Sequence, residues 1–271
     1  MTPFYRMRDD AGRDPPGPAL QSPAAVVVAH PDDEALWLSS VVGSADRVVF
    51  CFGDRFGKPK MAAARRQAVA ALPLTGVVDL EIPESGAGFS VDWAHPQPTP
   101  AGIAIVDAMA RARYEANHAR LVETLRAALA GFRSVCTHNP WGEYGHAEHI
   151  QIHRAVAALQ SELGYTVWFS NYVGDASLPL ARQLGSEPSW SERLILPPDL
   201  AIARGLKEVY RRYGAWTWTR AHRWPAWETI YALPPANSRK PRHALSGEWL
   251  LDVAGLRWWP PPWRLARRCL R

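Results

Sequence analysis

The sequence has few cysteines and lacks any long apolar run. The three cysteines, Cys51, Cys136 and Cys269, are odd in number, far apart and outside any C-x-x-C pattern. They therefore predict neither a disulfide framework nor a cysteine-based zinc cluster. A helix needs about 18 or more consecutive apolar residues to span a bilayer, and the sequence has no such stretch.

Blocks of Lys and Arg with interleaved aromatic residues are also missing, except at the extreme C-terminus. Nucleic-acid binding is therefore not predicted, in spite of a net charge of +5. The polar, Pro-rich N-terminus has no apolar segment of the kind that secretory signals carry. With the scarcity of cysteine, this predicts a cytoplasmic protein in a reducing compartment.

Tryptophan and proline are abundant, with 13 Trp and 24 Pro in 271 residues. Flat Trp surfaces are favoured by both sugars and acyl chains. The segment 258–271 places Trp beside Arg, a composition found where proteins touch the inner face of a membrane. Because the segment is short, we favour the alternative of a packed tail with a solvated basic end over peripheral membrane contact.

Short apolar runs alternate with helical patterns along the first two thirds of the chain. We expect strands over 24–29, 47–52, 77–82, 134–138 and 166–172, and helices over 35–42, 60–72, 117–130, 146–163 and 199–213. Alternating strands and helices predict an α/β fold with a mostly parallel sheet flanked by helices.

The predicted organisation is a flexible lead-in over 1–22 and a single domain over 23–271. Its core spans about 23–175. The Trp/Pro-rich C-terminal part, 176–271, is expected to cover or extend that core.

The first group of chemically informative residues follows the first strand. In His30-Pro31-Asp32-Asp33, the proline stiffens the turn, so His30 and Asp33 can converge on one ion while Asp32 points elsewhere. Imidazole and carboxylate suit Zn²⁺. The alternative is a pair of helix-capping aspartates and a loop histidine without a metal.

The second group follows the fourth strand. His146, His149 and His153 are spaced i, i+3, i+7 and therefore share one helix face. Surface or core histidines with ordinary hydrogen bonds are the alternative. Ligand sites in parallel sheets lie at the carboxyl ends of strands, where both groups fall, so the two together indicate one site.

These strings resemble a known family. Ala29–Glu34 (AHPDDE) resembles the signature of the PIG-L/LmbE-like deacetylases, and Asn139–His149 is similar to their second motif, where Tyr-Gly-His-Pro-Asp-His is common. Ala147 and Glu148 stand where the family often has Pro and Asp, although Glu148 keeps a carboxylate. The resemblance covers roughly residues 24–172.

The resemblance implies a Rossmann-like fold and a zinc-dependent N-deacetylase of amino sugars or their conjugates. It implies three metal ligands: His30, Asp33 and His149. It also implies that Asp32 is the general base toward the water that the metal activates. A protonated His146 would stabilise the oxyanion and then donate to the leaving amine, while Tyr144 would polarise the carbonyl.

Further residues are expected beside these groups. We expect three of them to support the ligands from outside: Glu34, Glu148 and His153. Three others are candidates for substrate contact: Arg65, Asp92 and Trp141. For Arg65 the family's Glu three residues later is replaced by Ala68, whereas turn capping by Asp92 and packing of Trp141 inside the domain are the alternatives.

The predicted function is removal of an N-acetyl or other N-acyl group from a small-molecule, lipid-linked or glycan-linked amino sugar. One Zn²⁺ per chain is expected, although Fe²⁺ or Co²⁺ can use the same ligands. The alternatives are a non-catalytic glycan-binding module on this fold and a metal-dependent amidase for a non-sugar substrate. A pure binder has no need of Asp32 and His146 together.

Overall fold

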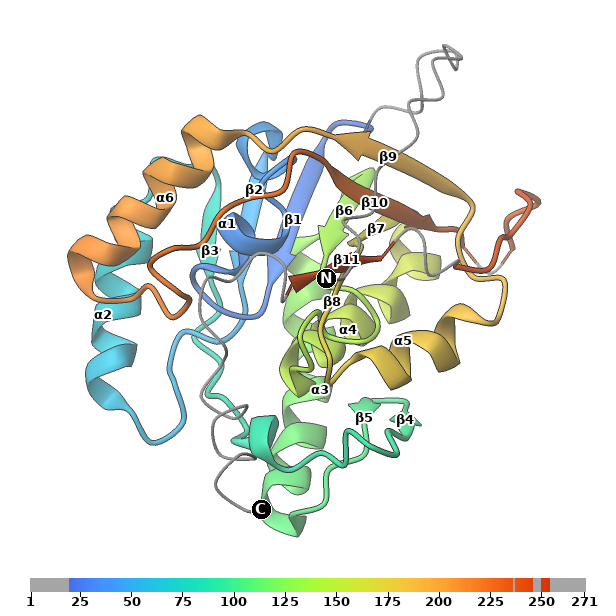
Figure 1. The fold of residues 1–271 in the computed structure, drawn as a ribbon, viewed down its shortest axis with the longest axis horizontal. Helices are drawn as coiled ribbons and strands as arrows, with labels where there is room; N and C mark the ends of the chain where they lie inside the picture. Colours follow the sequence, from blue (N-terminus) through green and yellow to red (C-terminus); the bar gives the residue numbers. More distant parts are fainter. Residues whose placement is uncertain (1–19, 236, 246–249, 254–271) are drawn as a thin grey trace, which may run out of the picture.

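A seven-stranded sheet forms the centre of the molecule, in the order β3-β2-β1-β6-β7-β10-β9 (Figure 1). The computed structural model describes residues 20–235, 237–245 and 250–253. The strands of this sheet are β1 (Ala24–Val28), β2 (Arg47–Phe50), β3 (Val77–Asp79), β6 (Ser134–Thr137), β7 (Thr166–Ser170), β9 (Glu192–Leu196) and β10 (Glu228–Leu233).

Strand β1 lies between β2 and β6 and is parallel to both. Val26 packs into the hydrophobic cluster on one face of the sheet, and its neighbour Val27 packs into the cluster on the other. Because both faces are covered, β1 is apolar at every position instead of alternating with polar residues.

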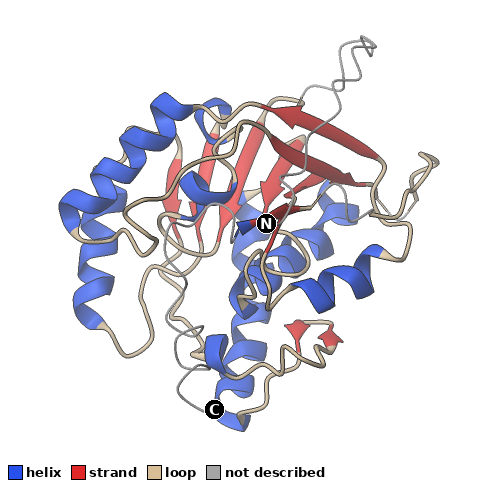
Figure 2. Ribbon diagram, viewed as in Figure 1, coloured by secondary structure: helices blue, strands red, loops and turns tan. Residues whose placement is uncertain are grey.

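Helices cover both faces of the sheet (Figure 2). Helices α2 and α6 pack on one face, and α3 and α4 pack on the other. The helices are α1 (Asp33–Trp37), α2 (Pro59–Ala70), α3 (Ala108–Ala128), α4 (Ala147–Leu163), α5 (Leu178–Gly185) and α6 (Leu200–Tyr213), with 3-10 turns η1 (Val42–Ser44) and η2 (Ala87–Phe89). Two short pairs complete the fold, β4 (Pro98–Thr99) with β5 (Gly102–Ile103), and β8 (Tyr172–Val173) with β11 (Leu251–Asp252).

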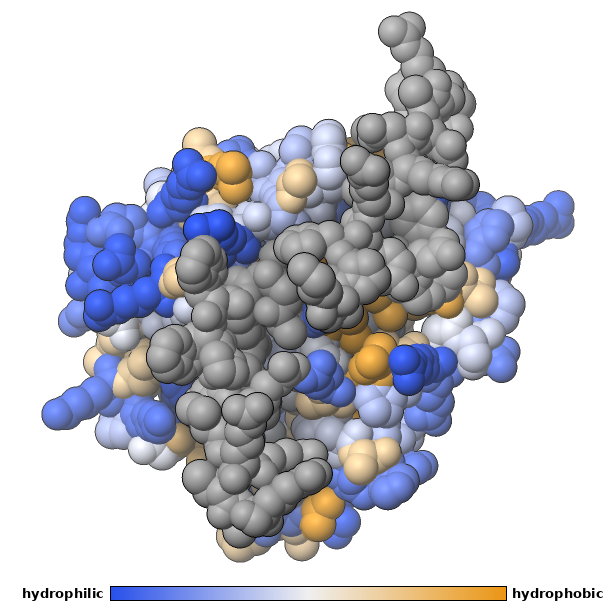
Figure 3. Space-filling model, in the orientation of Figure 1, coloured by the Kyte–Doolittle hydropathy of each residue, from blue (hydrophilic) through white to orange (hydrophobic). Residues whose placement is uncertain are grey.

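Helix α6 shows why these sequences form amphipathic helices. Leu206 and Tyr210 are buried against the sheet, while Arg204 and Arg211 are exposed. Hydrophilic side chains accordingly gather over α6 in the space-filling view, at the left of Figure 3. The side chain of Asp199 accepts the free N–H groups that begin the helix.

The predicted α/β class with a mostly parallel sheet is confirmed. Two helix boundaries differ from expectation. The helix expected over 35–42 is α1, which ends at Trp37. The helix expected from 117 begins at Ala108, because Asp107 caps it by accepting the N–H of Ala110 at 2.7 Å. Strand β10, antiparallel to β7 and β9, was not predicted.

Two predicted segments lie wholly or largely outside the described residues: the lead-in, 1–22, and the Trp/Arg segment, 258–271. Among the helices that the structure describes, none combines the length and apolar composition needed to cross a membrane.

Candidate active site

The two histidine-containing segments meet at one edge of the sheet. β1 and β6 are parallel neighbours, so their carboxyl ends point the same way. Residues 29–33 follow β1, and His146 immediately precedes α4 in the connection after β6. Ligand sites of open α/β sheets lie at such an edge.

The three predicted metal ligands converge. Asp33 Oδ2 lies 3.2 Å from His30 Nδ1 and 3.3 Å from His149 Nε2. All three side chains are buried. Burial opposes ionisation of Asp33, but the facing imidazoles outweigh it and hold the pKa of this carboxyl well below its usual range. A carboxylate and two imidazoles arranged in this way suit a divalent ion such as Zn²⁺.

Unsatisfied nitrogens provide a separate test of this fit. His149 Nε2 and His146 Nδ1 are buried and have no hydrogen-bond partner in the part of the chain that the structure describes. Ligand atoms of His30, His146 and His149 all lie within 4.8 Å of one another. Buried polar atoms without partners are rare, and a bound cation would satisfy His149 Nε2. The residues present therefore fit a metal ion.

Glu143 sets the orientation of His149. Its wholly buried carboxylate lies 2.7 Å from His149 Nδ1, so Nδ1 carries the proton and Nε2 keeps its lone pair for the ion. Burial raises the pKa of Glu143, but the imidazoles of His138 and His149 outweigh burial and lower it to about 2. Glu143 was not predicted from the sequence, because no pattern in the sequence marks this role. Its backbone lies in the left-handed region, with φ of 49°.

His138 is the second imidazole on Glu143. Its Nδ1 lies 3.1 Å from Glu143 Oε2, while its Nε2 accepts the N–H of Ala29 at 2.8 Å. Because that lone pair is already used, His138 supports the site and does not supply a ligand, although it lies near Asp33 and His149.

His30 Nε2 faces two carboxylates, Glu148 Oε2 and Glu84 Oε1, each at 3.3 Å. Burial lowers the pKa of His30, but Asp33 and these two carboxylates reverse the direction and raise it well above its usual value. Glu148 thus supports His30, as expected of a residue beside the ligands.

Glu84 was missed by the sequence argument because it lies in an irregular loop. Its Oε1 accepts from Arg65 Nη1 at 2.9 Å, and the same Nη1 donates to the carbonyl of Asp54 at 2.9 Å. Arg65 is only 3% exposed. Its described contacts hold Glu84 in place, and the expected contact of Arg65 with substrate stays a prediction.

Asp32 lies beside the proposed ligands and belongs to none of the potential ion-binding groups found among the described residues. Its backbone is in the left-handed region, with φ of 105°, and its N–H donates to Glu34 Oε2 at 3.1 Å. Its Oδ2 accepts the N–H and hydroxyl of Thr217 at 2.7 and 2.8 Å. Burial, followed by the charge of Asp33, raises the pKa of Asp32 to about 7, against the opposing effect of Thr217.

His146 and Tyr144 lie against the proposed ligand His149. The ring of His146 stacks on His149 with centroids 4.5 Å apart, and that of Tyr144 lies 5.8 Å from His146 and 5.5 Å from His149. Burial, followed by the charges of His149 and His30, lowers the pKa of His146 well below its usual range. This environment favours the neutral imidazole, in contrast to the protonated His146 that the family resemblance implies.

The remaining predicted residues lie farther from the cluster. Glu34 accepts from Tyr210 at 2.7 Å and holds the backbone of Asp32, and His153 Nδ1 lies 2.8 Å from the carbonyl oxygen of His138. Both therefore support the site from outside. Asp92 caps its own exposed turn by accepting the N–H groups of residues 94 and 95.

Trp141 requires a correction. It is 0% exposed, and its indole N–H donates to the carbonyl of Tyr172 at 2.6 Å. Its ring packs edge-on against Phe169. A side chain that is fully buried and hydrogen-bonded in the core cannot stack on a sugar, so Trp141 stabilises the loop instead.

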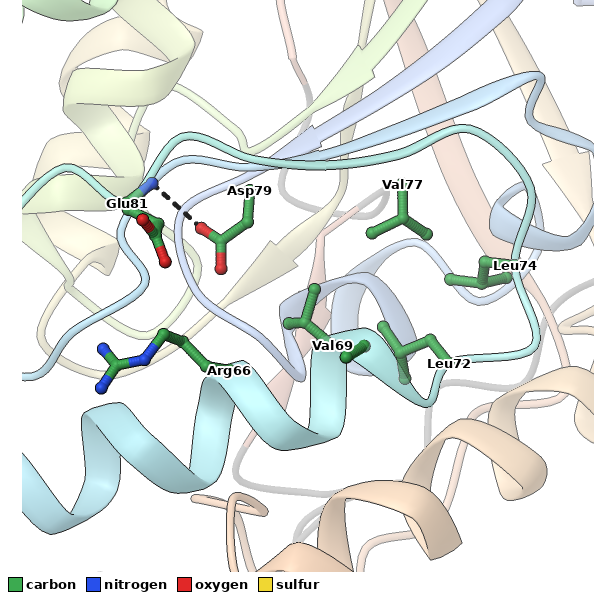
Figure 4. Close-up of a pocket in the computed structure, with 8 residues that line it drawn as sticks. Arg66, Val69, Leu72, Leu74, Val77, Asp79 and Glu81 are labelled. Carbon is green, nitrogen blue, oxygen red and sulfur yellow. Dashed lines mark hydrogen bonds between the residues drawn. The ribbon is translucent and has the colours of Figure 1, made fainter.

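A shallow groove lies elsewhere, between α2 and the edge strand β3 (Figure 4). It is lined by Arg66, Val69, Ala70, Leu72, Leu74, Val77, Asp79 and Glu81. None of the residues around Asp33 lines it, so the groove is separate from the histidine cluster.

Comparisons with known proteins address the fold and the family resemblance. No protein-family model matches the chain. In sequence, the chain is similar to a 1D-myo-inositol 2-acetamido-2-deoxy-alpha-D-glucopyranoside deacetylase of Corynebacterium kroppenstedtii. The identity is 28% over an alignment of 162 residues, and the match covers 52% of this chain and 41% of that protein.

In structure, the chain is similar to a deacetylase of the teicoplanin biosynthesis pathway in complex with teicoplanin. The TM-score is 0.55 at 12% identity, covering 79% of this chain and 99% of the other. The zinc-inhibited form of teicoplanin deacetylase Orf2 gives a TM-score of 0.53 at 12% identity, with the same coverage. At these identities the likeness shows the fold. With the sequence match, it confirms the predicted resemblance to PIG-L/LmbE-like deacetylases.

Proposed function

We propose that this chain is a metal-dependent hydrolase that removes an N-acetyl or other N-acyl group from an amino-sugar-containing substrate. The observation that carries the proposal is the convergence of His30 and His149 on Asp33, with Asp32 beside them and outside the ligand set. The sequence match to a sugar-conjugate deacetylase supports the substrate class. The matched stretch spans under half of that relative, so the substrate is proposed as a class only.

His30, Asp33 and His149 would hold one Zn²⁺. When bound, the ion supplies a Lewis acid for the amide carbonyl and lowers the pKa of water to about 7. One solved neighbour of this fold is described in a zinc-inhibited form, so zinc acts on that protein as an inhibitor.

Asp32 is suited to take the proton of the attacking water. Thr217 holds Oδ2, while no described residue donates a hydrogen bond to Oδ1, which is left to accept the proton. A carboxyl with a pKa near 7 exchanges protons readily at neutral pH.

Attack on the amide carbonyl creates a negative charge on the substrate oxygen. His146 and Tyr144 are placed to donate hydrogen bonds to that oxygen. The developing negative charge favours the protonated imidazole and so opposes the effect of burial on His146. His146, protonated from solvent as this charge develops, gives that proton to the amine nitrogen, the C–N bond breaks, and the amine leaves. Asp32 then releases the proton of the water to solvent.

The proposal is tested with purified zinc-loaded protein and N-acetylated amino sugars that are free, nucleotide-linked, lipid-linked or glycan-linked. At least one substrate should release acetate and free amine in equal amounts. Asp32→Asn should keep the zinc and lose about 10²–10⁴-fold in kcat. Glu162→Gln, at an exposed ion pair with Arg126, is the control. Failure of every N-acyl substrate would contradict the function, and near-full activity of Asp32→Asn would contradict the role of the base.

A further inference from the structure

The segment that follows α6, residues 215–224, reaches across the sheet edge to Asp32. We propose that Thr217 in this segment is a positioning residue that fixes the Asp32 carboxylate for proton transfer. The inference rests on the proposed hydrolase function. It adds a residue from the C-terminal part of the chain, where the sequence shows no motif.

The contact geometry is specific. Both donors of Thr217, its N–H at 2.7 Å and its hydroxyl at 2.8 Å, meet the same oxygen, Oδ2 of Asp32. Two donors on one oxygen restrict the rotation of the carboxylate and leave Oδ1 to accept the proton of the water. At the other side, Glu34 holds the N–H of Asp32 at 3.1 Å. Asp32 is thus constrained at its backbone and at its side chain.

The segment itself is anchored on α6. Lys207 Nζ donates to the carbonyl of Arg220 at 2.9 Å and lies over the rings of Trp216 and Trp224, at 5.2 and 5.5 Å from their centroids. These cation–π contacts and the hydrogen bond together hold the segment against α6.

A second anchor reaches α1, the helix that begins right after Asp32. The indole N–H of Trp224 donates to the carbonyl of Ala35 at 2.6 Å. The segment that carries Thr217 is therefore also tied to the helix that follows Asp32.

Packing does not explain Thr217. Its side chain is exposed, whereas Asp32 is 1% exposed. The ring of the neighbouring Trp218 lies 5.0 Å from that of Tyr144 and 5.1 Å from that of Trp37. The segment therefore also contacts residues beside the proposed ligands. Thr217 is exposed, yet both of its donors bond to the buried carboxylate of Asp32, and this contact orients that carboxylate. Misplacing a reacting group by about 1 Å can lower the rate about 10²-fold.

The test compares Thr217→Val, which removes the hydroxyl and keeps the shape, with Thr217→Ser, which keeps the hydroxyl. Thr219→Val is the matched control, because the hydrogen bond that Thr219 Oγ1 accepts among the described residues comes from the nearby N–H of Ala221. We expect Thr217→Val to lose about tenfold in kcat, the equivalent of one hydrogen bond to a charged group. KM and zinc content should stay at wild-type values, and Thr217→Ser should recover most of the rate.

Unchanged kcat in Thr217→Val would overturn the inference, and so would a parallel loss of zinc or an equal loss in Thr219→Val. If the wild-type protein hydrolyses none of the substrates, the proposed function fails, but the inference is still tested by crystal structures of zinc-loaded wild type and Thr217→Val. A rotated or multiply oriented Asp32 carboxylate in the variant supports the inference. The same single orientation in both proteins overturns it.

Discussion

Replacing Glu143 by Gln should weaken metal binding without touching a proposed ligand. The carboxylate of Glu143 lies 2.7 Å from His149 Nδ1 and 3.1 Å from His138 Nδ1, and it also accepts the N–H of Asn139 at 3.0 Å. An amide keeps only one acceptor oxygen and turns an NH₂ group toward donors. His149 would then place its proton on Nε2, the atom that faces Asp33, and lose its free lone pair there.

The magnitude follows from these contacts. A hydrogen bond to a charged group contributes about 1.5–3 kcal/mol, so losing one or two should lower the free energy of unfolding by about 3 kcal/mol. Removing a group that orients a metal-bound histidine typically costs 10–100-fold in metal affinity, and we expect a loss in this range.

Zinc affinity is measured by competition with a chromophoric chelator, and unfolding by urea titration of the apo protein. Glu162→Gln is the matched control, because the Glu162 carboxylate pairs with Arg126 at an exposed surface. It should leave zinc affinity and the urea midpoint unchanged. Wild-type zinc affinity in Glu143→Gln would refute the claim that Glu143 sets the tautomer of His149.

Three other outcomes are expected. His149→Ala should purify with far less than one zinc per chain by elemental analysis, and unchanged stoichiometry would remove His149 from the ligand set. Trp141→Ala should lower the free energy of unfolding by about 3–5 kcal/mol in urea titration, as for other buried aromatics; a raised KM with unchanged stability would instead restore the sugar-stacking role. Asp92→Ala should change kcat/KM by about twofold or less, as for most surface substitutions, and a larger loss would assign Asp92 to the substrate.

Much of the site could be predicted because it depends on local sequence and on one rule of sheet geometry. His30 and Asp33 lie in one tight turn after β1, and His149 lies on the first turn of α4. Because β1 and β6 are parallel neighbours, their following segments meet. The apolar run of β1 likewise predicted a strand buried on both faces.

Three further residues, Glu84, Glu143 and Thr217, could not be predicted, since their contacts depend on long-range geometry or on loop conformation. Glu143 lies in a loop with its backbone in the left-handed region, and no local pattern marks its contact with His149. Glu84 comes from an irregular loop without periodicity, and Thr217 meets Asp32 across 185 positions of sequence. Trp141 was a misleading candidate, because a loop tryptophan and a core tryptophan have the same sequence signature until the burial is known.

The fold divides the site between two stretches of chain. The side chains proposed to hold the ion all come from residues 30–149: His30 from the turn after β1, Asp33 from the start of α1, and His149 from the first turn of α4. The segment that carries Thr217 and Trp218 comes later in the chain. It is held by Lys207 of α6 and by the carbonyl of Ala35 in α1. Evolution or design could therefore exchange that segment and change the molecules admitted to the site, while the ion's coordination stays intact.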